Sequence, residues 1–178
     1  MRIDWKAGFW AGIISGLAAE LLLWGAMLAQ GISPLAGAPM GAAILLGPGV
    51  LQSPPTAGIV AASMAVHFGL AILYGLMLAA LIGRSSRGSA LLVGIAFGVV
   101  LWWLNYFLIA PVAFPWFVPL RGSPVSPLLH AAFGLIAAAA YLPLRRENRR
   151  AGADRRRRAR YVIVERRGYD DRRHPLAA

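Results

Sequence analysis

The sequence predicts an all-α protein, a four-helix transmembrane bundle followed by a disordered basic C-terminal tail. Of its 178 residues, 58% are hydrophobic and only 14% are charged, whereas globular domains are about 25% charged. The apolar residues gather in four segments, and each is long enough to cross a hydrocarbon core of about 30 Å at about 1.5 Å per residue. The expected membrane domain is residues 1–144, with spans at about 8–30, 59–82, 90–110 and 126–144.

The first span differs from a cleaved signal peptide. Its apolar run is longer than a signal-peptide core, Glu20 interrupts it, and three further spans follow. We therefore expect an uncleaved helix. The connection after it, residues 33–58, carries no charge. Pro39 suits the first turn of a short helix over residues 40–46, so we expect this connection to lie in the interface or to fold back against the bundle.

The other two connections differ in length and composition. Residues 83–89 form a short hairpin between the second and third spans. Before the fourth span, Phe114, Trp116 and Phe117 lie between prolines. This composition is typical of an interfacial aromatic belt, and a ligand-binding lid is the alternative interpretation.

Basic residues lie almost entirely on one side of the predicted spans. Seventeen of the 18 precede the first span, separate the second from the third, or follow the fourth, and Arg121 alone lies on the opposite side. Because Lys and Arg concentrate in cytoplasmic loops, we expect both termini in the cytoplasm and a multi-pass location in the bacterial inner membrane.

Small residues recur every four positions along each span. In lipid this pattern lets helix backbones approach closely, because packing rather than hydrophobic exclusion drives helix association there. It predicts a compact bundle or a homo-oligomer. The glycines expected at helix contacts are Gly8, Gly12, Gly16, Gly75, Gly94, Gly98 and Gly134.

Four polar residues interrupt the spans: Glu20, His67, Asn105 and His130. At about 100° per residue each lies near the small-residue face of its helix, and by helical rise all four lie in the outer half of the bilayer. We expect them to form one polar cluster. Asn and His often only hydrogen-bond between helices. An ionised Glu at this depth is costly unless it is paired or neutralised, which makes Glu20 the leading functional candidate.

Several functions suit such a cluster. Imidazole and carboxylate relay protons or bind a divalent cation, which favours an assembly, accessory or proton- or cation-responsive protein with no enzymatic activity and no resident cofactor. Two alternatives stay open: His67 and His130 as axial ligands of a haem, and a small transporter acting as an oligomer. The chain has no HExxH motif, phosphate loop or dinucleotide fingerprint, and without cysteine it has neither thiol chemistry nor disulfides.

Three segments resemble a group of small four-span bacterial inner-membrane proteins, some of them classed automatically as sodium:proline symporters. The segments are residues 66–75 (VHFGLAILYG), 114–117 (FPWF) and 130–134 (HAAFG). The resemblance covers about residues 5–144 and implies a four-span fold without a specific chemistry.

Residues 145–178 hold 13 of the 18 basic residues. A polybasic segment beside a membrane gains about 1 kcal/mol per basic residue from anionic lipid. We expect the bilayer, anionic lipids, and a second copy or a membrane-protein partner to bind this chain. Nucleic acid is not expected, because no aromatic stacking pattern accompanies the arginines. The expected headgroup contacts are Arg145, Arg146, Arg149 and Arg150.

Overall fold

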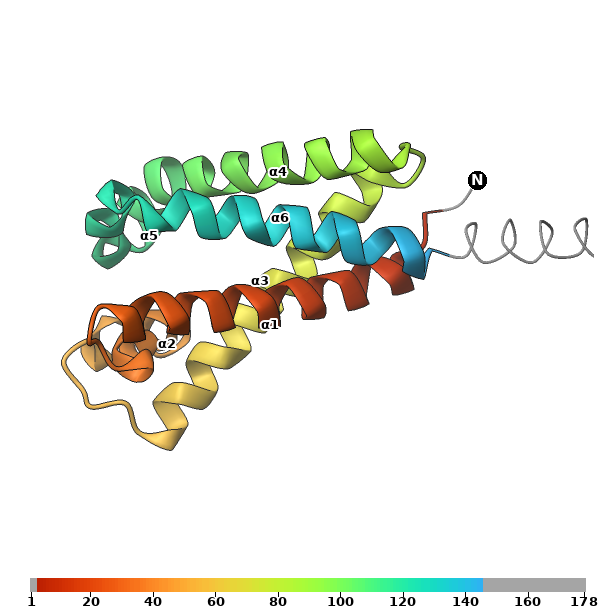
Figure 1. Ribbon diagram of the computed structural model, residues 1–178. Helices are drawn as coiled ribbons and strands as arrows, with labels where there is room; N and C mark the ends of the chain where they lie inside the picture. Colours follow the sequence, from red (N-terminus) through yellow and green to blue (C-terminus); the bar gives the residue numbers. More distant parts are fainter. Residues whose placement is uncertain (1–2, 146–178) are drawn as a thin grey trace, which may run out of the picture. The chain divides into compact units, whose positions relative to one another are not determined.

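The computed structural model describes residues 3–145 (Figure 1). The chain divides into two compact units, residues 1–142 and 143–178, and the description below concerns the first unit and the end of its last helix. The predicted tail lies almost wholly outside the described residues.

Four long helices make up most of the described chain, namely α1 (Trp5–Ala29), α3 (Ala57–Ile82), α4 (Arg87–Trp103) and α6 (Val125–Leu144). Helix α4 continues through the π-helical segment η3 (Leu104–Ile109) and α5 (Ala110–Ala113), so that the third span runs over Arg87–Ala113. All four are long and apolar enough to cross a membrane, and residues 3–145 contain no strand. The predicted all-α four-helix fold is confirmed, and it fits a multi-pass integral membrane protein.

Polar residues just outside the apolar runs begin three of these helices. The side-chain oxygens of Asp4, Thr56 and Ser86 accept hydrogen bonds from backbone N–H groups three residues later, at 3.1, 3.4 and 3.3 Å. Such N-caps satisfy donors that the first helical turn leaves free. The starts of α1, α3 and α4 are therefore set by local sequence.

The first connection folds back onto α3, as one of the sequence interpretations held. It consists of η1 (Pro34–Gly37), α2 (Ala38–Leu46) and η2 (Pro48–Val50). Ala42 is fully buried, and the buried cluster that it forms with Ala38 includes Ile59 of α3. Helix α2 ends at Gly47, whose φ of 83° favours glycine.

The second connection, η4 (Pro115–Gly122), contacts the first. The indole N–H of Trp116 donates to the carbonyl oxygen of Met40 in α2 at 3.1 Å. Phe114 and Phe117 pack beside the Trp116 ring, with centroids 5.7 and 6.2 Å away. The aromatic segment thus covers α2, where an indole N–H finds a partner that lipid tails do not offer.

Glycine contacts join the long helices in two pairs. Helices α1 and α3 cross where a Cβ added to Gly12 would lie 2.5 Å from the carbonyl oxygen of Ala71 (Figure 1). Helices α4 and α6 meet where a Cβ added to Gly94 would lie 2.5 Å from the carbonyl oxygen of Gly134. Neither contact leaves room for a side chain. The seven glycines expected at helix contacts all lie at these two crossings: Gly8, Gly12, Gly16, Gly75, Gly94, Gly98 and Gly134.

The two ends of the bundle are packed to different degrees. At the end where α1 begins and α6 finishes, here called the terminal end, Leu78, Ile82 and Tyr141 are at most 2% exposed. At the opposite end, called the connection end, α1 has no buried residue after Gly16. Beyond Gly16, α1 thus has no fully buried side chain against α3, whereas α2 and α3 keep their apolar contact at this end.

Candidate functional site

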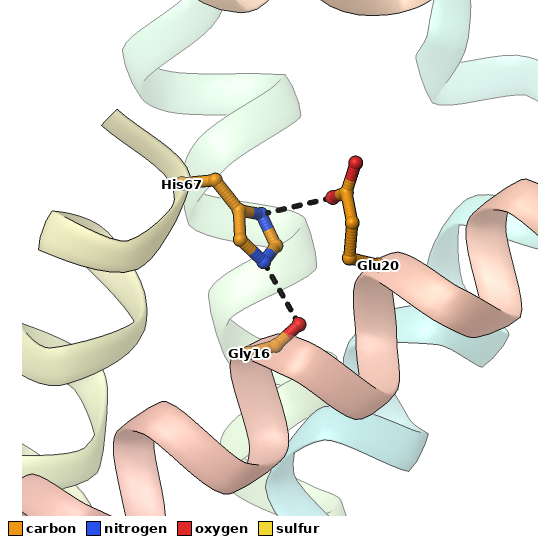
Figure 2. A network of polar contacts seen from close by, with 3 residues as sticks. All are labelled: Gly16, Glu20 and His67. Carbon is orange, nitrogen blue, oxygen red and sulfur yellow. Dashed lines mark hydrogen bonds and ion pairs between the residues drawn. The ribbon is translucent and has the colours of Figure 1, made fainter. Parts of the chain in front are cut away.

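Glu20 and His67 face each other across the α1–α3 pair (Figure 2). Each lies one helical turn beyond the contact of Gly16 with Ala71, on the connection-end side. His67 Nδ1 is 3.4 Å from Glu20 Oε2, and His67 Nε2 is 2.9 Å from the carbonyl oxygen of Gly16. The side chains are 28% and 12% exposed for His67 and Glu20. The arrangement therefore engages both nitrogens of one imidazole.

The Gly16 contact determines where the histidine carries hydrogen. A carbonyl oxygen only accepts, so His67 Nε2 must donate to it. In the neutral imidazole Nδ1 then presents a lone pair to the Glu20 carboxyl group. The contact between Nδ1 and Oε2 is attractive when one proton lies between them, as imidazolium with carboxylate or as imidazole with carboxylic acid. Without that proton, a lone pair faces a carboxylate and the contact is repulsive.

Few other ionisable groups belong to the helices around this pair. Helix α1 otherwise carries only Lys6, at the terminal end, and α2 carries none. Helix α3 carries only Tyr74 besides His67. Within these three helices, Glu20 can therefore be neutralised only by His67 or by a proton of its own.

Asn105 has a different partner, on the side of α3 that faces α4 and α6. The Tyr74 hydroxyl donates to Asn105 Oδ1 at 3.1 Å, and the Tyr74 ring packs edge-on against Phe133 of α6 at 6.3 Å. Asn105 lies in the π-helical segment η3, a geometry frequent at functional sites. Pro111 follows the segment and lacks the N–H that would bond to the carbonyl of Phe107. Tyr74 thus links α3 to the other helix pair.

His130 bonds within its own helix. Its Nδ1 lies 2.9 Å from the carbonyl oxygen of Ser126, one turn earlier in α6, and its ring packs against Tyr106 at 5.7 Å. The four polar residues that the sequence singled out thus take part in three separate contacts, and only Glu20 and His67 bond to each other. Among residues 3–145 no group of three or more His, Asp or Glu is arranged to hold a metal ion.

Sequence reasoning missed three polar residues that the structure makes prominent. Tyr74 could have been found, because a tyrosine hydroxyl inside a span needs a hydrogen-bond partner. Trp102 Nε1 and Ser126 Oγ are buried without a hydrogen-bond partner in the described part of the chain, and nothing in their spacing signals this. Of the expected headgroup contacts, Arg145 directly follows α6, whereas Arg146, Arg149 and Arg150 lie outside the described residues.

Comparison with known proteins adds no relative, because no protein-family model, curated protein or solved structure matches the chain. The class of protein is defined by its own fold and site, as a helical multi-pass membrane protein with a Glu–His pair between two spans.

Proposed function

We propose that the chain is a proton-responsive, non-enzymatic protein of the bacterial inner membrane with both termini in the cytoplasm. The observation that carries this proposal is the double engagement of His67, whose Nε2 donates to Gly16 while its Nδ1 faces Glu20 at 3.4 Å. One proton decides whether the second contact attracts or repels. The pair therefore converts proton occupancy into the strength of a helix–helix contact.

The packing around the pair favours movement of one half of α1. Towards the terminal end, Gly8 and Gly12 hold α1 against α3 at distances that leave no room for a side chain. Beyond Gly16, α1 has no buried residue, and its leucines, among them Leu17 and Leu28, are 52% and 61% exposed. The glycine contact acts as a pivot, and the Glu20–His67 pair acts as a proton-dependent clamp on the free half. Movement of that half would be read by a second copy or by a membrane-protein partner.

The alternatives demand more rearrangement at this site. Iron ligation by His67, as in the haem hypothesis, requires one of its nitrogens to leave Gly16 or Glu20. A divalent cation at Glu20 and His67 needs further ligands from water or a second chain. The proton-responsive role uses the contacts as they stand.

Distances between spin labels in the membrane-embedded protein test the proposal. The chain contains no cysteine, so labelled cysteines can replace the exposed residues Leu28 and Ala61, which lie on α1 and α3 near the connection end. We expect one short distance in acid and a longer, broader distribution in alkali. A second labelled pair at the exposed residues Phe9 and Leu81, near the terminal end, should not respond to pH.

The matched variant is Glu20→Gln. Its amide donates an N–H to Nδ1 when the imidazole is neutral and accepts from Nδ1–H through Oε1 when the imidazole is protonated, so the distance at the connection end should stay short throughout. An unchanged distance in the native chain, or a pH response that persists in Glu20→Gln, would show that the pair is only structural.

A further inference from the structure

Two buried donors in the α4–α6 pair lack an acceptor. Trp102 Nε1 and Ser126 Oγ have no hydrogen-bond partner among the described residues, and Ser126 is only 8% exposed. An indole N–H can only donate, and a hydroxyl can donate. Because unpaired buried donors are costly, a molecule that brings acceptor atoms to them is favoured.

Helix register places these two donors at one level of the pair. Gly94 lies against Gly134, and Gly98 lies against His130. The two helices run antiparallel, so a residue four positions later in α4 contacts a residue four positions earlier in α6. The next step towards the connection end brings Trp102 level with Ser126.

Arg121 is exposed and is joined to Trp102 through the Phe107 ring. Its guanidinium carbon is 5.8 Å from the centroid of the Phe107 ring, and the Phe107 ring packs edge-on against Trp102 at 5.3 Å. The sequence has no Asp or Glu from residue 21 to residue 146, so the chain offers this arginine no acidic neighbour from the adjoining helices and connections. Arg121 is also the only basic residue of the two connections at this end.

We propose that Arg121, Trp102 and Ser126 bind one anionic glycerophospholipid at the connection end of the α4–α6 pair. Arginine suits the phosphate, which its planar guanidinium can bond in bidentate fashion. The two neutral donors suit an ester carbonyl, which lies deeper in the same lipid. Trp102 is partly exposed, and its indole turns on binding so that the N–H reaches the carbonyl. The ligand class follows from the chemistry, since all three groups donate and only a lipid presents a phosphate above carbonyl acceptors at this depth.

The indole N–H resonance of Trp102 tests this site directly. We would label tryptophan with ¹⁵N, identify the resonance by its loss in Trp102→Phe, and titrate phosphatidylglycerol into the detergent-solubilised full chain. The resonance should shift and saturate. Lipid attracted by the arginines of residues 145–178 should not move it.

Arg121→Gln should raise the phosphatidylglycerol concentration at half-saturation about tenfold, because the charge-assisted contact with the phosphate is lost. Arg87 is also exposed but lies at the terminal end of the bundle, where α4 begins. It provides the matched control, and Arg87→Gln should leave the titration unchanged. Equal titrations of the two variants, or a Trp102 resonance that phosphatidylglycerol does not move, would contradict the proposal.

Two further ligands test whether the site binds a whole phospholipid or only one of its chemical groups. Inorganic phosphate alone should not move the Trp102 resonance, and an equal shift with it would indicate a free-anion site instead. Diacylglycerol, which keeps the esters but lacks the phosphate, should shift it only at higher concentration. The site is independent of the Glu20–His67 pair, so Glu20→Gln should bind phosphatidylglycerol normally.

Discussion

The α1–α3 and α4–α6 pairs are joined in the same way and differ one turn beyond their glycine contacts. In the first pair, that turn brings Glu20 of α1 against His67 of α3. In the second, it brings Trp102 level with Ser126, and neither Trp102 Nε1 nor Ser126 Oγ has a hydrogen-bond partner among the described residues. Glycine contacts hold each pair together. The polar side chains beside them contact each other in the first pair and lack hydrogen-bond acceptors in the second.

This difference assigns separate tasks to the two pairs. The α1–α3 contact is complete when it holds one proton, so it suits a response to pH. The α4–α6 contact has two hydrogen-bond donors without acceptors among the described residues, so it suits a ligand that accepts hydrogen bonds. Tyr74 joins the two pairs through Asn105 and Phe133.

The largest expected effect tests what the pairs share. Gly12→Ile and Gly98→Ile should each lower the free energy of unfolding by about 3 kcal/mol, because the new side chain meets backbone atoms that cannot move aside. Unfolding in mixed detergent–SDS micelles measures this. Gly25→Ile and Gly69→Ile are matched controls, since no atom lies within 4 Å of a Cβ at either position. A loss of stability in only one of the two variants would show that close glycine contacts do not stabilise both helix pairs.

The second prediction concerns the Glu20–His67 contact of the α1–α3 pair. His67→Ala should lower the free energy of unfolding by about 1–2 kcal/mol, because Glu20 loses its partner inside the membrane. The same unfolding assay measures this loss. Glu20→Gln is the matched control and should lose less, because its amide can still hydrogen-bond to His67 Nδ1. Equal losses in the two variants would remove the distinction between the pairs.

The third prediction concerns the link between the pairs. Tyr74→Phe removes the hydroxyl that donates to Asn105 and should cost about 0.6–1 kcal/mol, the usual range for a hydrogen bond between membrane helices. A double-mutant cycle with Asn105→Leu should recover most of this as coupling energy. Strictly additive effects would show that the bond does not join the two pairs.

The smallest effect compares two buried serines. Ser15 Oγ in α1 donates to the carbonyl of Ala11 at 2.7 Å, whereas Ser126 Oγ has no hydrogen-bond partner in the described part of the chain. Ser15→Ala should cost about 0.5–1 kcal/mol, and Ser126→Ala should be neutral or slightly stabilising in lipid-free detergent. The same unfolding assay distinguishes them. An equal loss at both positions would indicate that Ser126 is already satisfied.

The fold was largely predictable because the local amino-acid composition of a segment decides whether it can span a membrane. Long apolar runs and the polar caps Asp4, Thr56 and Ser86 need no tertiary information to indicate where helices lie. The glycine spacing likewise pointed to the surfaces that now lie at helix contacts, since only small residues allow backbones to approach. The short helix α2 was anticipated from Pro39, which favours a helix start.

The polar residues were harder to place, because depth and helix face do not identify a partner. Glu20, His67, Asn105 and His130 share a level and a small-residue face, and from that they were expected to form one cluster. The helix crossings give them different hydrogen-bond partners: α3 presents His67 to α1 and Tyr74 to Asn105, while His130 bonds to its own helix at Ser126. A side chain's neighbours depend on which helices cross and at what register.

The sequence by itself determined that four helices are apolar enough to span a membrane and which of their faces can approach closely. Both follow from interactions of each residue with lipid and with its own helix. The tertiary structure decided that Glu20 and His67 meet, while Trp102 Nε1 and Ser126 Oγ have no hydrogen-bond partner within residues 3–145. Those outcomes depend on the α1–α3 and α4–α6 crossings, which bring together residues that lie far apart in the chain.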